Sequence, residues 1–176
     1  MFNKKFVIIA FPRTGSTLVR HNLSSYFGVF VEHTHDRLYR PPGDDFTAVV
    51  TQRRNIFDCV CSHLVMLHTG EMSIYSHKEF NKFDIDLEDF GALVKSYQEF
   101  YQQIDLSGYR QVVDIWFDKL ILDPYYLFGK FNIVEKTSYG IERSPNRYTS
   151  LVKNIDEVYT YYQSLINNTG GTHVIC

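Results

Sequence analysis

A short polar loop follows the first apolar segment of the sequence, and its residue types suit an anion. The loop reads PRTGST, residues 12–17, and lies between an unbroken apolar run at 5–10 and a helical pattern at 16–27. Backbone N–H groups at a helix N-terminus lack intrahelical acceptors and lie at the positive end of the helix dipole, so they can hold an anion. Arg13 adds a planar guanidinium with five donors, which suits phosphate or sulfate. The loop therefore predicts an anion site with Arg13 at the reacting end of the ligand.

This loop differs from the phosphate loop of ATP- and GTP-using enzymes, whose pattern is G-x-x-x-x-G-K-[ST]. In the aligned octet, Ala10 replaces the first glycine and Ser16 replaces the lysine, while Thr17 keeps the hydroxyl position. The missing lysine removes the charge that reaches the β- and γ-phosphates. The loop therefore argues against ordinary kinase or NTPase chemistry and favours a different anionic ligand.

The elements that must position this loop follow from the hydrophobic pattern. Unbroken apolar runs predict strands at 5–10, 29–33, 47–52 and 110–117. Helical spacing predicts helices at 16–27, 56–68, 87–104, 119–131, with an interruption near Asp123-Pro124, and 154–168. Strands that alternate with helices predict parallel pairing with right-handed crossovers. We expect a single three-layer α/β/α domain, residues 1–176, with a central parallel sheet.

Composition narrows the class of protein. The chain has 176 residues, of which 44% are hydrophobic, as in a folded domain that buries a core. A formal net charge of -2 argues against a general nucleic-acid binder. The apolar run in MFNKKFVIIAF is too short for a signal peptide core or a membrane span, so we expect a soluble, cytoplasmic protein. Cys59 and Cys61 lie two apart on a predicted helix and point in different directions, so no metal site is expected.

The loop resembles that of a known family, the sulfotransferases that use 3'-phosphoadenosine 5'-phosphosulfate (PAPS). Their 5'-phosphosulfate loop has the form P-[KR]-[ST]-G-[ST]-T, which residues 12–17 match. The PRSGTTL version, known from tyrosylprotein and many bacterial sulfotransferases, is most similar. The resemblance covers separate motifs between about Phe6 and Phe131 in a chain that is short for the family, so it implies a compact member with reduced substrate loops.

A second segment strengthens the resemblance. VVTQRRNIFDCVCSHL, residues 49–64, is similar to the family's 3'-phosphate site, strand-R-N-P-x-D-x-x-x-S, with Ile56 in place of the proline. Arg54 at the strand end and Ser62 two helical turns later can converge on one anion. A third and weaker similarity joins VVDIWFDKLILDP, residues 112–124, to the family's structural Y-E-D-L-x-x-D-P segment. The resemblance implies a P-loop, sulfotransferase-like nucleotide-binding fold.

The resemblance also implies roles for the residues that match. Arg13 takes the position of the family's catalytic lysine or arginine. The residues implied to bind the donor's 5'-phosphate, besides Arg13, are those of the loop: Pro12, Thr14, Gly15, Ser16 and Thr17. Arg54 and Ser62 would bind its 3'-phosphate. Arg143 and Arg147 lie where the family has a late basic loop, although the usual R-K-G is absent, so either arginine or neither serves there.

The resemblance also implies a catalytic base, a side chain that takes a proton from the acceptor. EHTHD, residues 32–36, ends the second expected strand, on the same carboxyl edge as the loop. Thr34-His35 matches the end of the K-T-H sequence of cytosolic members, so His35 is the first choice and His33 the second. Glu32 stays open, because relatives with the PRSGTT loop use a glutamate.

The leading hypothesis is transfer of a sulfuryl group from PAPS to a hydroxyl or amine of a small molecule or carbohydrate, which releases adenosine 3',5'-bisphosphate. A P-loop kinase of a small metabolite and a catalytically inactive nucleotide-binding protein are the alternatives. The sequence pattern points to no particular acceptor, adenine platform or oligomeric state.

Overall fold

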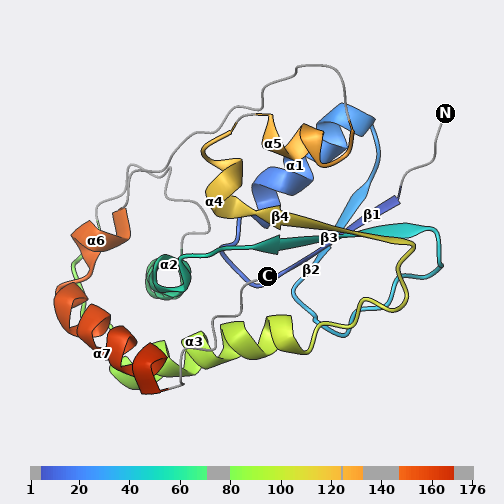
Figure 1. The fold of residues 1–176 in the computed structure, drawn as a ribbon. Coiled ribbons are helices and arrows are strands. Elements are labelled where there is room, and N and C mark those ends of the chain that lie inside the picture. Colours follow the sequence, from blue (N-terminus) through green and yellow to red (C-terminus); the bar gives the residue numbers. More distant parts are fainter. Residues whose placement is uncertain (1–4, 71–79, 124, 133–146, 169–176) are drawn as a thin grey trace. The chain divides into compact units, whose positions relative to one another are not determined.

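The computed structural model describes residues 5–70, 80–123, 125–132 and 147–168. A four-stranded sheet has the order β2-β1-β3-β4, and every pair of neighbouring strands is parallel (Figure 1). Its strands are β1 (Lys5–Ala10), β2 (Val31–Thr34), β3 (Phe46–Gln52) and β4 (Gln111–Trp116). The chain is therefore an α/β protein with a parallel sheet.

The helices follow the expected pattern closely. They are α1 (Ser16–Phe27), α2 (Ile56–Thr69), α3 (Leu87–Gln102), α4 (Phe117–Leu120), α5 (Tyr126–Gly129), α6 (Arg147–Leu151) and α7 (Ile155–Asn168). The predicted strands and helices are confirmed to within about two residues at most ends. The predicted helix at 119–131 is two short helices, and α6 was not predicted.

The sheet buries one face against three helices. Phe6, Ile8 and Ala10 of β1 alternate along that face, as a strand period of two requires. They form one hydrophobic cluster with buried residues of α1, α4 and α5, including Leu23 and Leu120. Figure 1 shows these three helices on the same side of the sheet. Both edges of β1 are paired and its last five residues are buried, which explains why its apolar run is unbroken.

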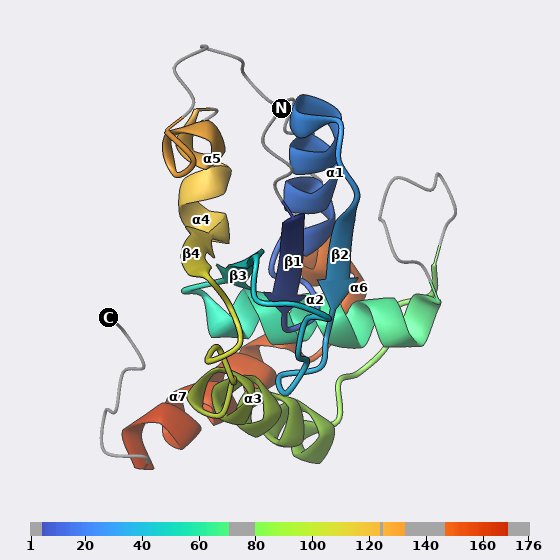
Figure 2. The ribbon, with the colours of Figure 1, turned by 90° about the vertical axis from the view of Figure 1, so that its right-hand side faces the viewer.

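The strand order creates a switch point beside β1. After β1 the chain moves to β2 on one side, and then returns across β1 to form β3 on the other side. Figure 2 shows β1 and β2 running in the same direction. In open parallel sheets, ligands bind outside the carboxyl ends of the strands at such a point. The loop after β1 and the residues after β3 both lie there.

The packing divides the chain into two compact units. Met1–Arg54 with Phe100–Arg143 form the first, and Asn55–Glu99 with Ser144–Cys176 form the second. The first unit holds the sheet, α1, α4 and α5. The second holds α2, most of α3, α6 and α7, and Figure 2 shows α3 and α7 side by side.

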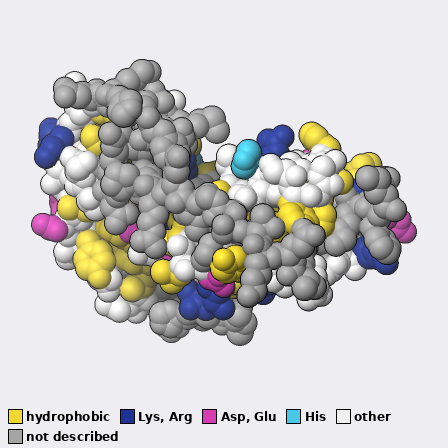
Figure 3. All heavy atoms as spheres, turned by 90° about the horizontal axis from the view of Figure 1, so that it is seen from above, with side chains coloured by type: hydrophobic (Ala, Val, Ile, Leu, Met, Phe, Trp, Pro, Cys, Tyr) yellow, Lys and Arg dark blue, Asp and Glu magenta, His cyan; other side chains and the backbone are white. Residues whose placement is uncertain are grey.

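The face drawn in Figure 3 shows no single dominant charge among its described side chains. On the face drawn in Figure 3, the described Lys and Arg side chains stand apart and are mixed with acidic and hydrophobic ones. In the described part of the chain, every helix is too short or too polar to cross a bilayer.

Candidate functional site

The backbone of the loop between β1 and α1 is bent in a way that favours anion binding. Arg13 has a φ of 69° and Gly15 a φ of 83°, both in the left-handed region. Left-handed residues next to right-handed ones make successive N–H groups point into one concavity, which binds anions. The first hydrogen bond of α1 runs from the Val19 N–H to the Gly15 carbonyl, so the earlier N–H groups of this helix have no intrahelical acceptor. A non-glycine residue with positive φ is uncommon, and such strain concentrates at functional sites.

Gly15 is required at its position for two reasons. Its φ of 83° disfavours any residue with a Cβ. A Cβ built there would also lie 2.3 Å from the Cδ2 of Phe117, the first residue of α4. The Phe117 ring therefore packs directly on the loop.

Thr14 fastens the loop to the neighbouring strand. Its side chain is fully buried, and its hydroxyl lies 2.8 Å from both the Phe11 carbonyl and the hydroxyl of Thr51 in β3. The Thr14 hydroxyl is thus engaged within the protein. Thr14 would therefore bind an anion through its backbone N–H. At the start of α1, Ser16 is buried and Thr17 is exposed.

Two arginines follow β3 at the same edge of the sheet. The guanidinium of Arg53 lies 4.9 Å from the centre of the Phe117 ring, and that of Arg54 lies 5.4 Å from the centre of the Trp116 ring. The backbone N–H of Arg54 donates a hydrogen bond of 2.6 Å to the Asp118 carboxylate. Stacking on an aromatic ring helps to hold each guanidinium in place.

Two histidines lie at the end of β2. The His35 Nδ1 is 2.6 Å from the carbonyl oxygen of Ala10, the last residue of β1. A carbonyl can only accept, so Nδ1 carries the hydrogen, and Nε2 of the neutral ring is left as the basic nitrogen. His33 packs edge-on against His35, with 4.6 Å between ring centres. Burial, and then the charges of His35 and Arg20, lower the pKa of His33 to about 4.

Glu32 belongs to a different environment. Strand residues alternate between faces, so Glu32 points to the face opposite His33. Its carboxylate accepts a hydrogen bond of 2.5 Å from the Tyr39 hydroxyl, which raises the Tyr39 pKa to about 12.

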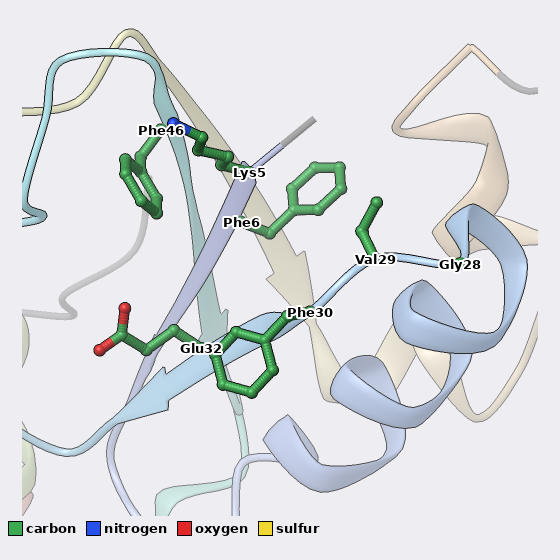
Figure 4. Close-up of a pocket in the computed structure, with 7 residues that line it drawn as sticks. All are labelled: Lys5, Phe6, Gly28, Val29, Phe30, Glu32 and Phe46. Atoms are coloured by element: carbon green, nitrogen blue, oxygen red, sulfur yellow. The ribbon is translucent and has the colours of Figure 1, made fainter. Parts of the chain in front are cut away.

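Glu32 also lines an open hollow at the amino ends of the strands, the edge opposite the loop. Figure 4 shows Glu32 and Phe46 on one side of β1, and Phe6 and Val29 on the other, beside α1. This hollow contains none of the predicted donor-binding residues.

The other expected residues fall outside the first unit or outside the described residues. Ser62 is buried in α2 and belongs to the second unit, so its predicted pairing with Arg54 stays a prediction. Arg147 begins α6, also in the second unit. Arg143 lies outside the described residues.

Several residues of the site were missed from the sequence. Three further residues contact the loop: Thr51, Tyr101 and Phe117. Each lies in an apolar sequence pattern, which is typical of core residues. For Thr51, a signal was present, because a threonine at the end of a buried strand needs a partner for its hydroxyl. Tyr101 comes from α3, which begins at Leu87, far along the chain from the loop, and no local pattern joins the two.

Comparison with known proteins adds no relative. No protein-family model, no curated protein and no solved structure matches the chain. Within the described residues, no three His, Cys, Asp or Glu side chains are grouped as ligands for a metal ion. The resemblance to sulfotransferases therefore stays a prediction from the sequence motifs.

Proposed function

We propose that the protein is a PAPS-dependent sulfotransferase with a P-loop, three-layer α/β/α fold. The observation that carries this proposal is the left-handed, glycine-dependent loop at Arg13–Gly15 beside a strand, β3, that is followed by two arginines. The loop follows β1 and the arginines follow β3, which pair side by side at the switch point of the sheet. The loop with Arg13 and the arginines after β3 would form two positively charged sites at the ends of adjacent strands. Such a pair of sites suits a nucleotide with a phosphate at each end.

The chain's own residues can divide the work of transfer. The N–H groups at the start of α1 would bind the 5'-phosphate, and Arg54 would bind the 3'-phosphate. Arg13 would stabilise the charge that develops on the bridging oxygen as the sulfuryl group leaves it. Preorganised donors directed at developing charge are usually the largest catalytic contribution.

His35 is the base that the geometry favours. Its Nε2 takes the proton of the acceptor hydroxyl, the acceptor oxygen forms a bond to sulfur, and the bond from sulfur to the bridging oxygen breaks. Adenosine 3',5'-bisphosphate is the leaving group. The pKa of His33 is lowered to about 4, so His33 accepts a proton poorly near neutral pH. Glu32 lies on the opposite face of β2 and accepts a hydrogen bond from Tyr39.

The proposal is tested by binding and then by transfer. Calorimetry should detect adenosine 3',5'-bisphosphate binding to the wild-type protein. Arg54→Ala should weaken that binding, whereas Arg13→Ala should abolish sulfuryl transfer from radiolabelled PAPS to an acceptor library while the protein stays folded. Arg110→Ala is a matched control, because Arg110 is an exposed arginine just before the amino end of β4. A wild-type protein that does not bind the bisphosphate would end this proposal.

A P-loop kinase is the second candidate, but the residues that end β3 argue against it. In ATP- and GTP-using P-loop enzymes, Mg²⁺ is held by the loop Ser or Thr and by an aspartate on a neighbouring strand. Here the strand paired with β1 ends in Gln52 and is followed by Arg53 and Arg54. Phosphorylation that needs ATP and Mg²⁺ would favour the kinase.

The third candidate is a nucleotide-binding protein that lacks catalysis. It shares the loop and the arginines with the enzyme and differs only in the acceptor site. Binding of the bisphosphate with no turnover over a broad acceptor panel would favour it.

A further inference from the structure

Tyr101, near the end of α3, joins the ends of the two strands that border the anion loop. Phe11 is the first residue after β1. The Tyr101 hydroxyl accepts a hydrogen bond of 3.2 Å from the backbone N–H of Phe11. The same hydroxyl donates to the Thr51 carbonyl in β3 at 2.5 Å. One oxygen atom therefore bridges β1 and β3 just where the loop begins.

The bridge is part of a closed ring of hydrogen bonds. Phe11 binds Tyr101 through its N–H and Thr14 through its carbonyl, while Thr51 binds Tyr101 through its carbonyl and Thr14 through its hydroxyl. Phe11 and Thr51 are buried, so water cannot easily replace a lost partner. Removal of the Tyr101 hydroxyl takes away the hydrogen bond from the Phe11 N–H and the hydrogen bond to the Thr51 carbonyl, both at the root of the loop.

The loop needs such anchors because its backbone is strained. Arg13 carries a Cβ at a left-handed φ of 69°, and such a strained conformation persists only when the surrounding structure determines it. We propose that Tyr101 is a positioning residue, whose hydroxyl holds the loop in the conformation that presents its N–H groups to an anion. Tyr101 acts through Phe11 and Thr51, and the proposal assigns it no contact with the ligand.

The experiment compares Tyr101→Phe with Tyr109→Phe. Both variants keep the ring and lose a hydroxyl that donates to a backbone carbonyl in the first unit, but Tyr109 donates to Tyr39, at 3.1 Å. In the ligand-free protein, hydrogen exchange of the backbone amides of residues 11 and 13–17 should be faster in Tyr101→Phe and unchanged in Tyr109→Phe. Unchanged exchange in Tyr101→Phe would overturn the proposal.

The second measurement is the affinity for adenosine 3',5'-bisphosphate, and this part rests on the proposed function. Tyr101→Phe should bind about tenfold more weakly, as expected when buried groups lose their hydrogen bonds, and Tyr109→Phe should bind as the wild type does. Faster loop exchange with unchanged affinity would overturn the positioning role. If the wild type fails to bind the bisphosphate, the proposed function falls, and the exchange rates still decide whether Tyr101 holds the loop.

Discussion

Gly15 is restricted in two ways, by its left-handed φ and by the Phe117 ring that packs against it. Mutations can separate these two effects. Gly15→Ala should destabilise the protein by about 2 to 4 kcal/mol. The new Cβ would meet the Phe117 ring, and an alanine would have to adopt an unfavourable φ. Urea unfolding measures this change. Anion binding should also fall, because the loop must shift to relieve the contact.

Gly28 is the matched control for Gly15. Its φ of 61° is also left-handed, but a Cβ there would meet no atom within 4 Å. Gly28→Ala should therefore cost only the backbone strain, about 1 kcal/mol. Equal losses for the two variants would mean that Phe117 can move away and that the loop is not tightly packed.

His33 predicts a specific dependence of stability on pH. Its pKa is lowered from 6.5 to about 4 in the folded protein, so between these values the unfolded chain binds a proton that the folded chain does not. Stability from this residue is therefore fully present above pH 6.5 and is lost as the pH falls toward 4. His33→Gln should reduce the loss of stability between neutral and acid pH by about 1 kcal/mol, because the ring is half-buried and solvent screens part of its charge. Urea unfolding of both proteins across this range gives the difference, and parallel curves would contradict it.

Asn154 shows how a side chain can join elements within the second unit. Its amide accepts from the Ile85 N–H and donates to the Ile85 carbonyl, both at 2.9 Å. Asn154 directly precedes α7, and its side chain pairs with this distant backbone. The segment around Ile85 is thereby fixed to the start of α7.

Asn154→Ala should lower the free energy of unfolding by about 2 to 3 kcal/mol, because it leaves two backbone groups of a buried residue unsatisfied. Thermal unfolding followed by circular dichroism is a suitable measurement. Asn132→Ala is a poor control because Asn132 has a positive φ, whereas Asn81→Ala changes an exposed asparagine of ordinary backbone and should have little effect. A loss no larger than that of Asn81→Ala would mean that water replaces the amide.

Across the whole molecule, the two units have separate hydrophobic clusters. One includes Leu23 and Ile115, and the other includes Phe90 and Val158. Trp116 is the only tryptophan and belongs to the first unit, so its fluorescence reports on that unit. Circular dichroism reports on helices of both units.

Phe90→Leu should therefore separate the two signals. The substitution removes packing from the second cluster, where Phe90 is fully buried, and should cost about 1 to 2 kcal/mol. We expect the urea midpoint from circular dichroism to fall while the midpoint from Trp116 fluorescence stays constant. Leu23→Val is the matched change in the first cluster and should move the fluorescence midpoint. Coincident shifts in both variants would mean that the units unfold as one.

Much of the local structure was readable from the sequence. The run at 5–10 and the helix at 16–27 have the predicted bounds, because burial on both faces and a 3.6-residue stripe leave strong periodic patterns. Gly28 ends α1 with a left-handed φ, as expected of a glycine after a helix. The position of the loop between β1 and α1 followed from these two elements.

Only the tertiary structure decided what surrounds that loop. The placement of β3 beside β1, the Phe117 ring on Gly15 and the Tyr101 bridge all join residues that are far apart in the chain. Hydrophobic periodicity records which face of an element is buried, and it carries no information about which distant element covers that face. The sequence by itself therefore determined the loop and its candidate residues, while long-range packing decided which other side chains hold the loop in shape.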